Sequence, residues 1–197
     1  MPLSRRDFIA GTALASAAVL LGACSDDENE QVASTAEELP PTPACDDGGD
    51  PTPEQTEGPY YTPDTPERTD LLEDGVTGDR LVLTGTVMAT DCRPVAKVML
   101  DFWQADGEGE YDNEGFCLRG HQFTDSRGRF RLTTVVPGLY PGRTRHIHVR
   151  VQRPDGEVLT TQLYFPGEAQ NDSDGLFDDA LLMDLKGSRA RYDFVLA

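Results

Sequence analysis

The chain has 197 residues, a length that fits one domain of ordinary size with short appendages. Its formal net charge is −18 at pH 7, and no basic patch is evident in the sequence. A surface of this charge repels nucleic acid, so nucleic-acid binding is excluded as a function.

The N-terminus has the pattern of an export signal. Residues 4–9 contain the pair Arg5-Arg6, typical of the twin-arginine route, and residues 10–23 are apolar and rich in alanine. That apolar run is short for a membrane span, so residues 1–23 are predicted to be a signal peptide. Because this route exports folded proteins, it is compatible with a cofactor that is loaded before export.

The predicted signal ends in Leu21-Gly22-Ala23-Cys24, which is similar to a bacterial lipobox. In this interpretation Cys24 is lipidated and becomes the first residue of the mature protein; the alternative is a cleaved signal with a coincidental cysteine. We expect an exported protein, either a cell-envelope lipoprotein or an extracellular one. The lipid on Cys24 would be its only membrane contact.

Residues 24–54 are acidic and rich in proline, with few apolar side chains, so they are predicted to be a disordered tether. The remaining cysteines are Cys45, Cys92 and Cys117. An exported domain can hold a disulfide, but the sequence alone does not choose the pair. A four-cysteine metal site is disfavoured because no C-x-x-C unit is present.

Short segments with alternating apolar and polar residues follow from about residue 56. They cover residues 80–90, 95–105, 128–136, 146–152, 158–165 and 191–196. Turn sequences containing Pro, Gly or Asp separate them. This pattern predicts an all-β fold, an antiparallel β-sandwich with long loops and little helix. Residues 178–185 alone have a helical pattern.

Two of the three histidines lie on one predicted strand, as His146-Ile147-His148. Alternate side chains of a strand share a face, so His146 and His148 point the same way, whereas Ile147 points toward the packed side. Two imidazoles on one face are half of a metal site. The alternative interpretation is two ordinary polar residues on a solvated face.

The other ligands decide which metal such a pair would hold. Arg150 and its neighbours stand where a cupin-type site would have a carboxylate, which weakens that interpretation. A three-histidine zinc site would need His121. An iron(II) site would need one carboxylate ligand beside the two histidines, and no Asp or Glu is singled out for that role by its spacing from them. Tyr111 and Tyr140 lie in loops and could supply phenolates, although a loop tyrosine is more often a packing residue.

Several motifs occur together in a fixed order. They are Thr56-Glu57-Gly58-Pro59-Tyr60, Asp101-Phe102-Trp103-Gln104-Ala105-Asp106 with Tyr111 after it, Leu118-Arg119-Gly120, Pro137-Gly138-Leu139-Tyr140-Pro141, Arg143-x-x-His146-Ile147-His148 and Thr161-Gln162-Leu163-Tyr164-Phe165. In this combination, residues 55–165 resemble the intradiol ring-cleavage dioxygenases of the protocatechuate 3,4-dioxygenase and catechol 1,2-dioxygenase type. The export signal and the Thr-Glu-Gly-Pro-Tyr segment resemble more narrowly the secreted members.

The resemblance implies a transthyretin-like (prealbumin-like) catalytic sandwich over residues 55–197 and a bound Fe(3+). It implies iron(III) ligands at Tyr111, Tyr140, His146 and His148. Tyr140 would also act as a base for a catechol hydroxyl, and Arg143 would stabilise negative charge on the substrate. Gln162 would help to position the reacting groups, and Gly58, Pro59 and Tyr60 would contribute to substrate binding.

The implied reaction uses O₂ to open a catechol ring between its two hydroxyl-bearing carbons, giving a muconate-type diacid. The alternatives are an exported β-sandwich that binds ligands without turnover, and a three-histidine zinc enzyme. The protocatechuate enzymes have a tryptophan where this chain has Gly142, which predicts a more open pocket. Catechol, substituted catechols, hydroxyquinol and protocatechuate all remain candidate substrates, and the oligomeric state is left open.

Overall fold

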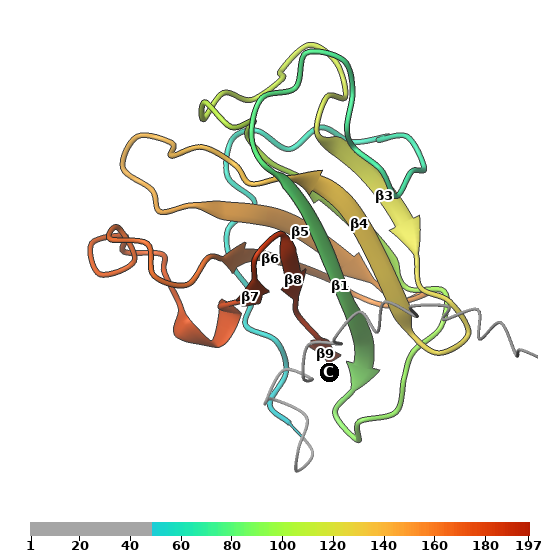
Figure 1. Ribbon diagram of the computed structural model, residues 1–197. Helices are drawn as coiled ribbons and strands as arrows, with labels where there is room; N and C mark the ends of the chain where they lie inside the picture. The colour runs from blue at the N-terminus through green and yellow to red at the C-terminus, as the bar shows by residue number, and fades with distance from the viewer. Residues whose placement is uncertain (1–48) are drawn as a thin grey trace, which may run out of the picture. The chain divides into compact units, whose positions relative to one another are not determined.

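The computed structural model describes residues 49–197. The predictions for the signal peptide, for Cys24 and for Cys45 lie outside the described residues, as does most of the predicted tether. Within residues 49–197 the chain forms β-strands and one short 3₁₀ turn, and no helix there is long and apolar enough to cross a membrane. The all-β prediction is confirmed (Figure 1).

Two sheets make up the fold. The first has the order β4-β1-β8-β7, with β9 also paired to β1; its strands are β1 (Arg80–Ala89), β4 (Arg129–Val135), β7 (Asp184–Lys186), β8 (Arg189–Arg191) and β9 (Phe194–Leu196). The second has the order β3-β2-β5-β6; its strands are β2 (Met99–Trp103), β3 (Arg119–Phe123), β5 (His146–Gln152) and β6 (Val158–Tyr164). The long strand β1 is visible in Figure 1.

The C-terminal strand differs from the prediction in two ways. Residues 191–196 were expected to form one antiparallel strand, but β8 and β9 are separate and both run parallel to β1. The break has a local cause, because the Asp193 carboxylate accepts a hydrogen bond from the Thr86 amide at 2.7 Å. The Asp193 side chain thereby replaces a backbone carbonyl as the hydrogen-bond partner of β1 at this point.

The helical prediction for residues 178–185 is wrong. Only the 3₁₀ turn η2 (Asp179–Leu181) forms, with the Asp178 side chain accepting a hydrogen bond from the Ala180 amide at its start. The chain then passes Tyr164, whose backbone carbonyl accepts a hydrogen bond from the Met183 amide at 3.0 Å. Leu181 and Met183 are both buried, so the segment is held by burial of alternate side chains rather than by a helix.

The core consists of the apolar faces of the two sheets. On the second sheet, Phe102, Ile147 and Val149 have exposed fractions of 0% and belong to the core cluster. The opposite face of that sheet carries polar residues in register: His148 is paired with Trp103 on β2 and with Gln162 on β6. Strand alternation therefore places His146, His148 and Gln162 together on the outer face.

A segment before β1 covers this outer face. It pairs with one edge of the second sheet, where the Gln55 amide donates to the Thr160 carbonyl at 2.8 Å. It reaches the other edge at β3, where Glu67 forms a parallel bridge with His121. The segment begins earlier than expected, since Thr52 is buried and its amide donates to the Val195 carbonyl at 2.9 Å. The last residues of the predicted tether are thus attached to the sandwich.

Of the cysteines in the described residues, Cys92 is disulfide-bonded and Cys117 is a free, half-buried thiol. A Cys92–Cys117 disulfide is therefore excluded from the pairings that the sequence left open.

Candidate metal centre and active site

The two imidazoles of β5 face each other. The Nε2 atoms of His146 and His148 are 3.1 Å apart, and the side chains are buried, with exposed fractions of 5% and 3%. The Nδ1 atom of His146 lies 2.6 Å from the Thr144 carbonyl oxygen. Because a carbonyl only accepts, Nδ1 carries the proton in this contact and Nε2 presents its lone pair to His148.

Burial keeps both rings neutral at pH 7. It lowers the pKa of His146 to about 4 and holds the pKa of His148 well below its usual value. In addition, Nδ1 of His148 is buried without a hydrogen-bond partner in the described part of the chain. Two neutral Nε2 atoms aimed at each other need a shared proton or a cation between them, so the pair fits a metal site.

Three phenols meet beside the histidines. The Tyr60 ring stacks on the Tyr111 ring, with centroids 4.4 Å apart, and the Tyr60 hydroxyl donates to the Tyr140 hydroxyl at 3.0 Å. The Tyr111 ring centroid is 6.2 Å from that of Tyr140 and 6.4 Å from that of His148. The structure therefore brings the four residues that the resemblance implied as ligands into one cluster, and Tyr60, expected to bind substrate, contacts two of them.

Two of the phenols, Tyr111 and Tyr60, have pKa values raised above that of a free tyrosine. Burial raises the pKa of Tyr111, against the opposing charges of Arg143 and Arg119. The hydrogen bond to Tyr140, followed by burial, raises the pKa of Tyr60. A phenolate in this cluster requires compensation by positive charge. Two phenols with two imidazoles form a donor set that suits a hard, highly charged cation.

His121 does not join the cluster. His121 lies on β3, and its Nδ1 atom is 2.8 Å from the Thr65 carbonyl oxygen of the segment before β1. Residues 49–197 contain no group of three His, Cys, Asp or Glu side chains able to hold a metal. The three-histidine zinc site considered from the sequence is therefore wrong.

Two residues fix the plane of His148. The Trp103 ring stacks on the imidazole with centroids 4.8 Å apart and an interplanar angle of 9°. On another side lies Gly58, which has φ of +70°, and a Cβ atom there would be 3.4 Å from Cε1 of His148. Both the positive φ and the close approach favour glycine at this position. Pro59 between Gly58 and Tyr60 is exposed.

The Arg143 guanidinium is fixed on two sides. Its Nε atom donates to the Asp174 carboxylate at 2.9 Å, and its Nη2 atom donates to the Gln162 side-chain oxygen at 2.6 Å. The Gln162 amide nitrogen in turn donates to the Thr56 carbonyl at 2.9 Å. Nη1 of Arg143 makes no hydrogen bond to any residue that the structure describes, so it remains available to a ligand.

Asp174 also supports the histidine pair, and sequence reasoning missed it. Its carboxylate accepts a hydrogen bond from the Thr144 amide at 2.8 Å, and the Thr144 carbonyl is the partner of His146. Burial by itself would raise the pKa of Asp174, but hydrogen bonds from Leu176, Thr144 and Arg143 leave it lowered. No local signal could have singled out this acid among the 35 Asp and Glu residues.

Arg119 is a second residue that supports the cluster and that the sequence did not predict to do so. Its exposed fraction is 1%, and it donates from Nη2 to the Asp112 carbonyl at 2.7 Å and from Nη1 to the Tyr60 carbonyl. These bonds tie the loop that carries Tyr111 to the segment that carries Tyr60. Burial lowers the pKa of Arg119, and the neighbouring Asp112 and Tyr111 oppose that effect.

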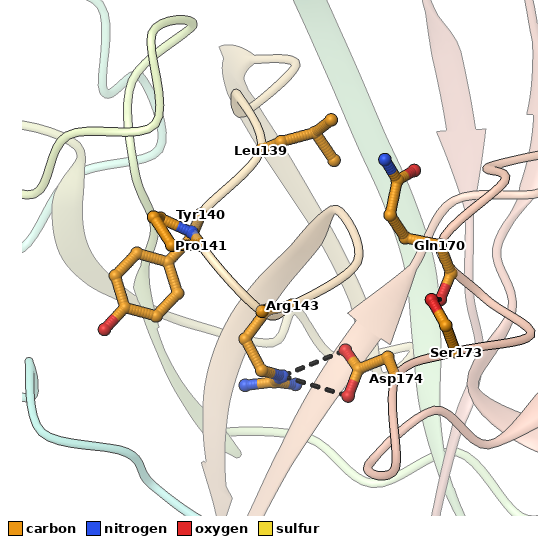
Figure 2. A pocket seen from close by; sticks show the side chains of 8 residues that line it. Leu139, Tyr140, Pro141, Arg143, Gln170, Ser173 and Asp174 are labelled. Atoms are coloured by element: carbon orange, nitrogen blue, oxygen red, sulfur yellow. Dashed lines mark hydrogen bonds and ion pairs between the residues drawn. The ribbon is translucent and has the colours of Figure 1, made fainter.

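A cleft of about 360 Å³ opens beside this cluster. It is lined by Leu139, Tyr140, Pro141, Gly142, Arg143, Gln170, Ser173 and Asp174. Figure 2 shows the Arg143 guanidinium facing the Asp174 carboxylate, while the Tyr140 ring points away from Gln170 and Ser173. Tyr140 and Arg143 thus border both the cleft and the His–Tyr cluster.

Comparison with known proteins identifies the family. Residues 56–181 match a family model described as "Dioxygenase". The relatives include the protocatechuate 3,4-dioxygenase beta chain of Burkholderia cepacia, 34% identical over 109 residues, which cover 46% of each chain. They also include chlorocatechol 1,2-dioxygenase of Cupriavidus pinatubonensis, 33% identical, covering 56% of this chain and 53% of the relative. The chain belongs to the intradiol ring-cleavage dioxygenase family.

Solved structures of dioxygenases share the fold. The dioxygenase domain of a dioxygenase–carbohydrate-binding protein fusion from Streptomyces sp. SirexAA-E is 56% identical, with a TM-score of 0.72 over 75% of this chain and 98% of that domain. The 3-chlorocatechol 1,2-dioxygenase of Rhodococcus opacus 1CP is 30% identical, with a TM-score of 0.68 over 74% and 72%. The chain spans about half the length of the curated relatives it matches.

Proposed function

We propose that the protein is an iron(III)-dependent intradiol dioxygenase that opens catechol-type rings between the two hydroxyl-bearing carbons and releases muconate-type diacids. The observation that carries this proposal is the cluster of two facing imidazoles and neighbouring phenols. Its members stand at the positions expected for ligands in this family: His146, His148, Tyr111 and Tyr140. Family membership supports the same reaction class.

The iron would be held by the Nε2 atoms of His146 and His148 and by the phenolate oxygens of Tyr111 and Tyr140. Ferric iron supplies the Lewis acidity that favours the ionised catechol, and the redox chemistry of ring opening by O₂. Trp103 and Gly58 keep His148 in place, and the Thr144 carbonyl fixes the tautomer of His146. The chain therefore presents its donor atoms already oriented.

In the proposed reaction Tyr140 accepts a proton from the substrate, and Tyr60 is its hydrogen-bond partner. As a phenolate, Tyr140 accepts the proton of a catechol hydroxyl, so that the substrate binds as an anion. The Tyr60 hydroxyl lies 3.0 Å from the Tyr140 oxygen and stabilises whichever form Tyr140 takes, because a hydroxyl can donate or accept.

Arg143 stabilises the negative charge that develops on the ring and on the opened product. Its position is set by the Asp174 carboxylate and by the Gln162 oxygen, so little reorganisation is needed when charge appears. The free Nη1 donor is the group of Arg143 that can reach a substrate.

The proposal is tested by loading the purified protein with iron(III) and recording its visible absorbance and oxygen uptake with catechol. We expect a broad phenolate-to-iron absorption band. Tyr111→Phe and Tyr140→Phe should each weaken this band and lower oxygen uptake by about a hundredfold or more, while His121→Asn, outside the cluster, should change neither. A protein that binds iron without a visible band contradicts the ligand assignment. A coloured protein that takes up no oxygen with any catechol supports the alternative of a binding module.

We also propose that the protein is exported by the twin-arginine route and anchored through a lipid on Cys24. The motifs at residues 4–9 and 21–24 support this export route and this membrane anchor. Recovery of the mature Cys24→Ser variant in the membrane fraction at the wild-type level would contradict the lipid anchor.

A further inference from the structure

Three of the four arginines near the site have a carboxylate partner. Arg143 is paired with Asp174, whose side chain has an exposed fraction of 2%. Arg145 is paired with Glu168 at 2.9 Å, and Arg150 lies 3.7 Å from Glu57. The fourth, Arg119, donates to the backbone carbonyls of Tyr60 and Asp112 and does not line the cleft beside Arg143.

The cleft beside Arg143 has no other cation among its lining residues. Its far wall consists of Gln170, Ser173 and Asp174, which offer an amide, a hydroxyl and a carboxylate. Its near wall is open at Gly142, where an added Cβ would meet no atom within 4 Å. A ring substituent that points from the Tyr140–Arg143 side into this cleft therefore has room and neutral hydrogen-bond partners, but meets no uncompensated positive charge.

From this arrangement we infer that the pocket selects uncharged catechols and discriminates against catechols with a ring carboxylate, and that Asp174 is a specificity determinant because it neutralises Arg143. The inference rests on the proposed function and narrows its substrate class. It favours catechols that carry neutral polar or bulky substituents, for which Gln170 and Ser173 are suitable partners.

Charge alone is enough to produce the discrimination. A carboxylate that leaves water for the cleft loses hydration and gains no unpaired cation, whereas an amide of the same shape can bond to Gln170 and Ser173. One unfavourable charge interaction at a partly solvated site changes affinity by about tenfold.

The test compares 3,4-dihydroxybenzoate with 3,4-dihydroxybenzamide, which have nearly the same shape and differ in charge. Their affinities for the iron-loaded protein are measured by anaerobic titration of the visible absorbance, so that the reactivity of the ring toward oxygen does not enter. Unsubstituted catechol is titrated and then turned over in air as the reference. We expect the amide to bind about tenfold more tightly than the benzoate. Equal or tighter binding of the benzoate overturns the inference.

Two variants test whether the discrimination between benzoate and amide arises in this cleft. Asp174→Asn leaves Arg143 uncompensated, and Gln170→Lys adds a cation to the wall while keeping the Arg143–Asp174 pair. Both should raise the benzoate-to-amide affinity ratio relative to wild type, and the second does so without disturbing Thr144. If neither variant alters the ratio while both still bind catechol, Asp174 is not the determinant. If wild type neither binds nor oxidises catechol, the proposed function itself fails, and the inference with it.

Discussion

A single backbone carbonyl sets the chemistry of the histidine pair. The Thr144 carbonyl accepts a hydrogen bond from the protonated Nδ1 of His146, and this leaves the Nε2 lone pair directed at His148, 3.1 Å away. The strand alternation predicted that these two side chains share a face, and the structure confirms it. The sequence could not predict that the face is buried, because the segment that covers it lies far earlier in the chain, before β1.

The buried pair makes the stability of the metal-free protein depend on pH. The unfolded chain protonates His146 near its ordinary pKa of 6.5, whereas the folded chain does so only near pH 4. Between these values the unfolded state binds more protons, so the free energy of unfolding falls as the pH falls. The expected loss between pH 7 and 4 is about 3 kcal/mol from His146, with a further loss from His148.

Urea unfolding of the metal-free protein across this pH range measures the effect. The matched control is the double variant His146→Asn, His148→Asn, which lacks both groups and should show a shallower pH dependence. The same slope in wild type and double variant would mean that the pair is not held neutral by burial.

The pairing of Arg143 with Asp174 could not be predicted from the sequence. Arg143 could be recognised from its place before the histidines, but its carboxylate partner follows β6 in a loop without periodicity. Only the fold brings the two together. Tyr111 and Tyr140 were easier to find than Asp174 but harder than Arg143, because only the motifs around them distinguished them from packing residues.

At the scale of elements, the strands that alternate in the sequence are the strands that form. β5 has the predicted bounds, β1 and β6 end one residue earlier than predicted, and β4 is one residue shorter at each end. β2 forms only over Met99–Trp103, within the predicted segment 95–105. The short strand β3 was missed because its sequence, Arg-Gly-His-Gln-Phe, buries Arg119 and Gln122 and exposes Phe123. Arg119 is buried beside the site, where it bonds to the Tyr60 and Asp112 carbonyls, and the Gln122 side chain accepts a hydrogen bond from the Arg131 amide on β4. Alternation in the sequence cannot reveal such contacts of buried polar side chains.

The pairing of β1 with the C-terminal segment depends on a glycine. A Cβ atom at Gly85 would lie 1.8 Å from the Tyr192 carbonyl oxygen and 2.7 Å from the Phe130 ring. Gly85→Ala must therefore separate the strands, and we expect a loss of about 1–3 kcal/mol or more in the free energy of unfolding.

Gly175→Ala is the control for this variant, because a Cβ at Gly175 meets no atom within 4 Å. Thermal or urea unfolding of both variants provides the comparison. Equal stabilities would show that β1 and the C-terminal segment do not pack as tightly as described.

For the molecule as a whole, the net charge of −18 is the dominant surface property. Like charges repel one another in the compact state and are screened over about 10 Å at 0.1 M salt. We therefore expect the melting temperature of the protein to rise when sodium chloride increases from about 0.01 M to 0.5 M. A melting temperature that falls with added salt would show that ion pairs such as Arg143–Asp174 outweigh the general repulsion.

The product formed from catechol and isotopically labelled O₂ tests the central claim most directly. Cleavage between the hydroxyl-bearing carbons by the iron-loaded protein predicts a muconate-type diacid whose mass shows both atoms of the labelled oxygen. A semialdehyde, formed by cleavage beside the hydroxyl pair, would contradict the intradiol assignment. The absence of any ring-opened product from catechol or its neutral derivatives would contradict the catalytic account of the His146–His148 and Tyr111–Tyr140 cluster.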